Sequence, residues 1–94
     1  MEYLEIINYI STLLELEESK TEHDIYKENK YYIDYDVNTM LFNYKNIEWA
    51  IEYLNYEETI KYNNNSFILY NQHDIFKTYY FKNHIEVVNY ILEC

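Results

Sequence analysis

The chain has 94 residues, with 17 acidic side chains against seven lysines and no arginine, so its formal net charge is −10. This charge repels DNA, RNA and anionic membrane surfaces, which disfavours direct binding to any of them and favours a basic partner. The length allows one core only, and the Leu, Ile, Val and Phe residues together with fourteen tyrosines supply its apolar mass. We therefore predict a single acidic globular domain over residues 1–94.

The chain contains neither glycine nor proline. Glycine-rich phosphate loops, dinucleotide fingerprints and nucleophile elbows all need glycine, which disfavours a nucleotide enzyme of standard type. The N-terminus is acidic where a secretory signal is basic, and no apolar run approaches the roughly 18 residues of a membrane span. We expect a cytoplasmic protein, in the host cytoplasm if it is viral, that needs no cofactor.

The first predicted element is an amphipathic helix over residues 2–17. Its apolar residues recur at spacings of three and four, which is the helical period, and they are Tyr3, Ile6, Ile7, Ile10, Leu13 and Leu14. Its polar side carries Glu2, Glu5, Glu15 and Glu18. Residues 19–30 are polar without a sustained period, so we predict an irregular connection there.

Two strands are predicted next. Tyr31, Ile33, Tyr35 and Val37 alternate with polar residues, which is typical of a half-buried strand. Asp34 and Asp36 are then expected on the outer face of that strand. After a turn at Asn38 and Thr39, the alternating residues Met40, Phe42 and Tyr44 predict a second strand.

A second helix is predicted from Asn46, as N-cap, with Ile47, Ala50, Ile51 and Leu54 on its apolar face. Strands over 59–62 and 67–70 follow, joined by the polar residues 63–66, and then a strand over 75–81. The pair Asn83 and Glu86 resembles a capping box that opens a last helix. Its predicted buried face is Ile85, Val88 and Leu92.

This order predicts an α+β fold, in which an antiparallel sheet is packed by about three helices on one side. The alternative is an all-α, degenerate helical-repeat-like chain. A second pattern concerns residues 23–27 and 73–77, which read His-Asp-Ile-Tyr-Lys and His-Asp-Ile-Phe-Lys. Both an internal duplication and a coincidence of biased composition remain open.

The His-Asp pairs at 23–24 and 73–74 are the first candidates for chemistry, with His84 the third histidine. Adjacent residues point in different directions on a helix or a strand, so neither pair predicts a metal or catalytic site. Asp34 and Asp36 could bind a cation or hydrolyse a glycoside, but a solvated strand face is favoured. The lone Cys94 allows no internal disulfide. We predict no catalytic residues, no metal and no enzyme activity.

The acidic residues are concentrated in residues 1–36, where ten acids and three lysines give a local charge of −7. Carboxylates about 6 to 7 Å apart along a helix or strand form a row comparable to the phosphates of one DNA strand. The simpler interpretation of these acids is a solvated face that keeps the protein soluble. The predicted partner-binding residues are Glu15, Glu17, Glu18, Glu22, Asp24, Glu28, Asp34 and Asp36.

These features predict a non-enzymatic acidic inhibitor or binding protein that occupies a basic, nucleic-acid-binding surface of a target protein. The most concrete version is a phage or viral counter-defence protein of the anti-CRISPR or DNA-mimic type. One alternative is an immunity protein or antitoxin that neutralises a basic toxin by the same electrostatics. Another is a generic protein-interaction adaptor, and a homodimer also remains open.

Overall fold

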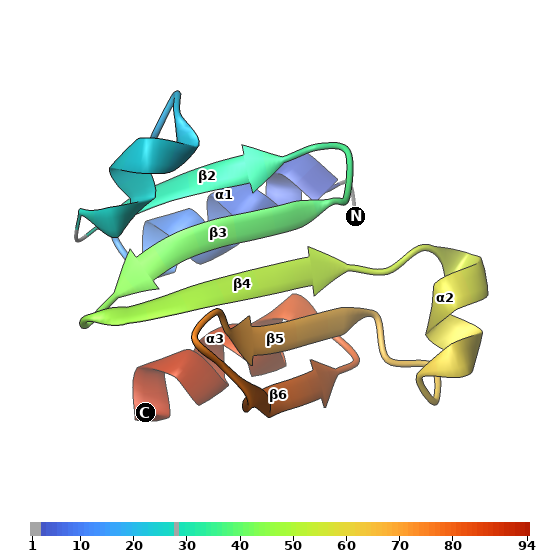
Figure 1. Ribbon diagram of the computed structural model, residues 1–94. Coiled ribbons are helices and arrows are strands. Elements are labelled where there is room, and N and C mark those ends of the chain that lie inside the picture. The colour runs from blue at the N-terminus through green and yellow to red at the C-terminus, as the bar shows by residue number, and fades with distance from the viewer. Residues whose placement is uncertain (1–2, 28) are drawn as a thin grey trace.

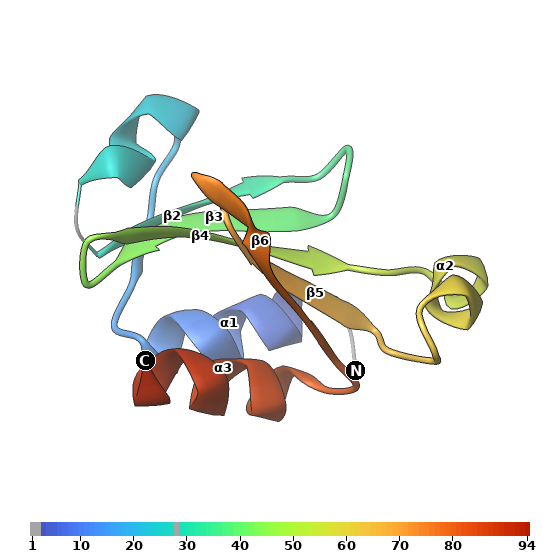
Figure 2. The same ribbon diagram turned by 60° about the horizontal axis from the view of Figure 1, so that its bottom comes forward.

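A computed structural model describes residues 3–27 and 29–94, within which a six-stranded sheet carries two helices on one face (Figures 1 and 2). The strands are β1 (Glu17–Glu18), β2 (Lys30–Asp34), β3 (Thr39–Tyr44), β4 (Ile47–Tyr53), β5 (Phe67–Asn71) and β6 (Asp74–Phe81). The helices are α1 (Tyr3–Leu13), α2 (Tyr56–Lys61), α3 (His84–Glu93) and the 3-10 helix η1 (Glu22–Tyr26).

The strands lie side by side in chain order. β1 runs parallel to β2, and every other neighbouring pair is antiparallel. The α+β prediction is therefore confirmed, with the two-residue β1 making the sheet mixed, and the all-α alternative is wrong. The two similar segments also fold differently, since residues 23–26 lie in the 3-10 helix η1 and residues 74–77 lie in β6, so the structure does not support a duplication.

The core lies between the sheet and the helices α1 and α3, which run side by side beneath it in Figure 2. Alternate side chains of each strand point toward the helices, as the pleat requires. Phe42 and Leu69 are fully buried at the centre of this layer. The other principal members are Ile6, Ile7, Ile10, Tyr31, Ile33, Met40, Trp49, Ile51, Phe67, Val87, Val88 and Ile91.

Helix α1 ends four residues earlier than predicted. Glu15 adopts a left-handed conformation with φ 55°, the N–H of Leu16 bonds to the carbonyl of Ser11 at 2.8 Å, and that of Glu15 bonds to Thr12 at 3.3 Å. These bonds form a Schellman motif, which glycine usually closes. The sequence has no glycine to mark this end of the helix, so the pattern of apolar residues alone predicted a longer one. Glu15 and Glu18 lie after the helix and not on its polar side.

The predicted helix from Asn46 is wrong, since residues 47–53 form β4. Lys45 and Asn46 both have positive φ, 52° and 65°, and make a two-residue turn whose twist suits a hairpin. Buried Trp49 and Ile51 alternate with outward-facing residues, and β4 pairs with both β3 and β5. Over only seven residues, the sequence fits both the helical period of about 3.6 residues and the strand period of two. Pairing with strands distant in sequence decides for the strand.

The strand predicted over 59–62 is also wrong, because Thr59 to Lys61 belong to α2. Asn55 caps that helix by accepting a hydrogen bond from the Glu58 N–H at 2.8 Å, and the Glu58 carboxylate accepts one from the Asn55 N–H in return. This capping box was present in the sequence as Asn-x-x-Glu. The strands predicted at 67–70 and 75–81 are confirmed as β5 and β6.

The last helix is confirmed as α3, with Asn83 accepting from the Glu86 N–H at 2.9 Å. Its buried residues are Val87, Val88 and Ile91. The buried face is therefore rotated about the helix axis by roughly one residue position from the predicted one. Ile85 and Leu92, which we expected in the core, remain 48% and 44% exposed.

Two phenylalanines give a matched test of this core. Phe42 is 0% exposed, whereas Phe76 in β6 is 94% exposed. Replacing Phe42 by Ala should lower the free energy of unfolding by about 3 to 5 kcal/mol, because it removes buried area and leaves a cavity. Phe76→Ala should change it by no more than about 0.5 kcal/mol. Urea unfolding followed by circular dichroism measures both, and equal effects would contradict the assigned faces of the sheet.

Candidate functional site

The first group of predicted binding residues lies at one end of the sheet, where the turn after α1, β1 and η1 meet. Glu15 is in the turn, Glu17 and Glu18 form β1, and Glu22 and Asp24 are in η1. All are exposed except Asp24, which is half-buried. We call these five residues the β1–η1 acidic patch. The structure thus brings five of the eight predicted residues to neighbouring elements.

Lys30 reduces the charge of this patch. Its Nζ lies 2.8 Å from Glu17 Oε2, across the parallel β1–β2 pair. The hydrogen bond from Lys30, together with its charge, lowers the pKa of Glu17, and the same contact raises the pKa of Lys30. Both groups are accessible to water, so the pair adds little stability. It partly neutralises the charge of Glu17.

Asp34 and Asp36 lie at the other end of β2, about 13 Å from its start at the usual rise per residue. Asp34 is the last residue of the strand and Asp36 lies in the following turn. The Asp36 N–H donates to Asp34 Oδ1 at 3.1 Å, so one carboxylate stabilises the turn. The prediction that both project from one strand face is therefore wrong. Glu28 lies outside the described residues.

The sheet face opposite α1 and α3 carries a different kind of surface. Figure 1 looks on to it, with both helices behind the strands and no helix in front of β4 and β5. The 3-10 helix η1 covers only the β2–β3 end, where Ile25 is buried. We call the outward side of β4, β5 and β6 the open face, and its residues are Glu48, Ala50, Glu52, Ile68, Tyr70 and Tyr80.

Two carboxylates of β4, Glu48 and Glu52, project from the open face four residues apart. The Glu48 carboxylate pairs with the His73 imidazole from the β5–β6 turn. Among the residues that the structure describes, ion pairs join Glu48 to His73 and Glu17 to Lys30, and none reaches Glu52. Glu52 is thus a half-buried carboxylate without a cation.

The surroundings of Glu52 disfavour its charge. Its cross-strand neighbours Thr39 and Ile68 are only 5% and 8% exposed. Burial, and secondarily the charge of Glu58, raise the pKa of Glu52. Burial and the charge of Glu52 in turn raise the pKa of Tyr70. Two described carboxylates thus have shifted pKa values, Glu52 upward because of burial and Glu17 downward because of Lys30. The sequence pattern missed Glu52 because it placed residues 46–54 in a helix.

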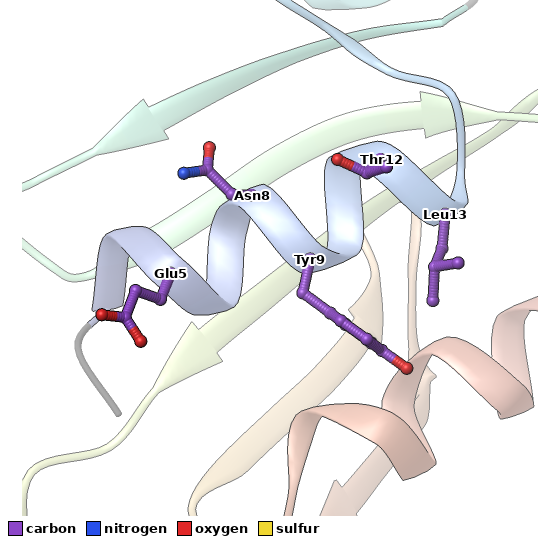
Figure 3. A pocket seen from close by; sticks show the side chains of 5 residues that line it. All are labelled: Glu5, Asn8, Tyr9, Thr12 and Leu13. Atoms are coloured by element: carbon purple, nitrogen blue, oxygen red, sulfur yellow. The ribbon is translucent and has the colours of Figure 1, made fainter.

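A surface hollow of about 450 Å³ lies along α1, lined by Glu5, Asn8, Tyr9, Thr12 and Leu13. Figure 3 shows the Tyr9 ring pointing toward α3, where it meets the His84 ring edge-on at 4.9 Å. All five lining residues come from a single helix, so the hollow is a shallow strip rather than an enclosed site. It brings together no nucleophile, base and orienting group of the kind that covalent catalysis uses.

The three histidines are separate. His23 is exposed in η1, His73 contacts Glu48 instead of its neighbour Asp74, and His84 packs against Tyr9 and Phe67. Within residues 3–27 and 29–94, no group of three or more His, Cys, Asp or Glu side chains is placed to hold a metal ion. Cys94 is exposed with a free thiol. No helix in these ranges is long and apolar enough to cross a membrane.

Comparisons with protein-family models, with curated proteins and with solved structures found no match. The candidate functional surfaces are therefore defined by the residues of this chain alone. They are the β1–η1 acidic patch and the open face around Glu52.

The uncompensated charge of Glu52 predicts a pH-dependent effect on stability. A carboxyl group whose pKa is higher in the folded state stabilises the fold when protonated, and that contribution is lost as the pH rises through the folded pKa. Glu52→Gln should therefore raise the free energy of unfolding at pH 7 by roughly 0.5 kcal/mol, a small value because water screens the charge. The gain should disappear near pH 4. Urea unfolding at both pH values measures it.

Glu18→Gln is the matched control for this experiment, because it makes the same change of net charge at an exposed position in β1. It should shift stability less than Glu52→Gln at pH 7. A loss of stability in Glu52→Gln at neutral pH would contradict the account, since it would mean that the carboxylate has a favourable partner.

Proposed function

We propose that this protein is a non-enzymatic acidic inhibitor or binding protein that occupies a basic, nucleic-acid-binding surface of a target protein in the cytoplasm. A phage or viral counter-defence protein of the anti-CRISPR or DNA-mimic type, acting in the host cytoplasm, is its most concrete form. The observation that carries the proposal is the charge of −10 on a 94-residue chain. The exposure of four of the five residues in the β1–η1 acidic patch supports it further.

The mechanism is electrostatic competition with nucleic acid. The β1–η1 acidic patch and the Asp34–Asp36 turn lie at the two ends of β2, about 13 Å apart. Exposed carboxylates at these positions attract lysine and arginine side chains that otherwise contact phosphates. Fields of this kind accelerate association and are screened within about 8 to 10 Å at physiological salt. Binding should therefore depend steeply on ionic strength.

The test is capture of partners from a lysate of the natural host, compared with capture by a variant in which Glu15, Glu17, Glu18 and Glu22 are all Gln. Captured proteins are identified by mass spectrometry, and the purified target is assayed for nucleic-acid binding by gel shift. The protein should displace nucleic acid from its target. Raising the salt from about 0.05 to 0.5 M should weaken capture at least tenfold, as the Debye length shortens. The four-Gln variant should lose most of its capture at low salt.

A second four-Gln variant, at Glu5, Glu57, Glu86 and Glu93, makes the same change of net charge away from the patch. It should retain its partners. Equal losses in both variants would mean that net charge alone matters, and unchanged partners in the patch variant would contradict the proposed surface. A nuclease toxin as the target would identify the immunity-protein or antitoxin alternative.

A generic interaction adaptor is a second candidate, favoured by two apolar side chains near the β5–β6 turn. Ile75 is 74% exposed and Phe76 is 94% exposed. Aromatic side chains presented in this way are typical anchors of protein interfaces. An adaptor of this kind would keep its partner at high salt and lose it in Phe76→Ala, so the same capture assay separates the two functions.

A further inference from the structure

Glu48 and Glu52 form a natural comparison, because they lie on the same strand and project from the same face. The Glu48 side chain has a cationic partner within the molecule, His73, and the Glu52 side chain has none among the described residues. An ionised carboxylate held partly out of water without a partner destabilises a fold. A cation from another molecule that paired with Glu52 would remove this cost.

The side chains around Glu52 indicate the chemistry of that cation. Thr39 and Ile68 flank it across the strands, and Tyr70 lies diagonally from it at a spacing that a tyrosine ring can bridge. Ala50, two residues earlier in β4, is fully buried and small. A bare metal ion would need several further oxygen ligands. A cation with an extended apolar or planar surface suits the apolar and aromatic side chains around Glu52 better than a metal ion does.

We propose that the open face holds a binding site for an arginine side chain of a protein partner, with Glu52 as its counterion and Tyr70 as its stacking surface. A guanidinium group binds a carboxylate through two parallel hydrogen bonds and stacks on aromatic rings, whereas lysine offers only a compact, strongly hydrated charge. The acidity of Glu52 and the negative charge of the chain complement a basic partner. The inference rests on the proposed function for that basic character.

No helix lies in front of β4 and β5, the strands that carry Glu52 and Tyr70. Helices α1 and α3 lie behind the sheet, and η1 reaches only its β2–β3 end (Figure 1). Glu58 of the neighbouring α2 adds a second negative charge near Glu52, which strengthens the attraction for a cation. Arginine binding would remove the electrostatic penalty that the free protein carries at Glu52.

The experiment uses N-acetyl-arginine methylamide as the probe and N-acetyl-citrulline methylamide as its neutral isostere. Each is titrated into the isotopically labelled full-length protein, and backbone amide shifts are recorded by NMR at low salt. The arginine probe should bind with a Kd on the order of 1 to 10 mM, as expected for one ion pair with one stacking contact. The largest shifts should fall on Thr39, Glu52, Ile68 and Tyr70, and citrulline should cause far smaller ones.

Three variants separate the parts of the site. Glu52→Gln should raise the Kd of the arginine probe roughly tenfold or more, since the negatively charged partner of the probe is removed. Glu48→Gln, the matched control on the same strand, should change its Kd less than twofold. Tyr70→Phe keeps the stacking ring and should bind about as well as the wild type, whereas Tyr70→Leu should bind more weakly.

Equal shifts with arginine and citrulline, unchanged affinity in Glu52→Gln, or shifts confined to the β1–η1 acidic patch would each overturn this site. Its failure is distinguishable from that of the proposed function, because the probe titration needs no natural partner. Probe binding at Glu52 together with salt-insensitive partner capture would support the site and contradict the proposed function. Salt-sensitive capture without probe binding at Glu52 would do the reverse.

Discussion

The structure depends on packing both long helices, α1 and α3, against one face of the sheet. Phe42 and Leu69 are completely buried in that layer, and the buried residues of both helices belong to the same core cluster. On the opposite face, the 3-10 helix η1 packs only on the β2–β3 end, so most of that face has no helix over it. The uncovered part of that face carries tyrosines, aliphatic side chains and two carboxylates, and Glu52 lies there between Thr39 and Ile68.

The acidic residues divide into two roles on this framework. Those at the two ends of β2 are mostly exposed. Under the proposed function they would provide a long-range, salt-sensitive field that steers a basic partner. Glu52 is held in a less polar environment. Under the proposal, a charge pair formed there would be stronger than one in water and would slow dissociation of the complex. The exposed Phe76 near the β5–β6 turn adds apolar area outside both regions. In this account the field governs encounter and the open face governs specificity.

The sequence predicts much of the fold where one period is sustained or a cap is visible. The stripe of α1, the alternation around Phe42 and the Asn83 cap of α3 were all readable. It fails at β4, where seven residues fit both periods and pairing with β3 and β5 decides. The end of α1 was hidden because Glu15 takes a position that glycine usually marks. Those two errors misplaced the acids and concealed Glu52. The first arises because β4 is decided by pairing with strands distant in sequence, and the second because the local turn after α1 is closed by a residue other than glycine.

The most direct test of this account is the pKa of the Glu52 carboxyl group in the free protein, measured by carbon-13 NMR titration of its side chain. Burial and the nearby Glu58 should place it above the ordinary range for glutamate. Addition of the arginine probe should bring it down, because a bound cation favours the ionised form. A pKa at or below the ordinary range in the free protein would show that Glu52 is already compensated, and would contradict the central claim.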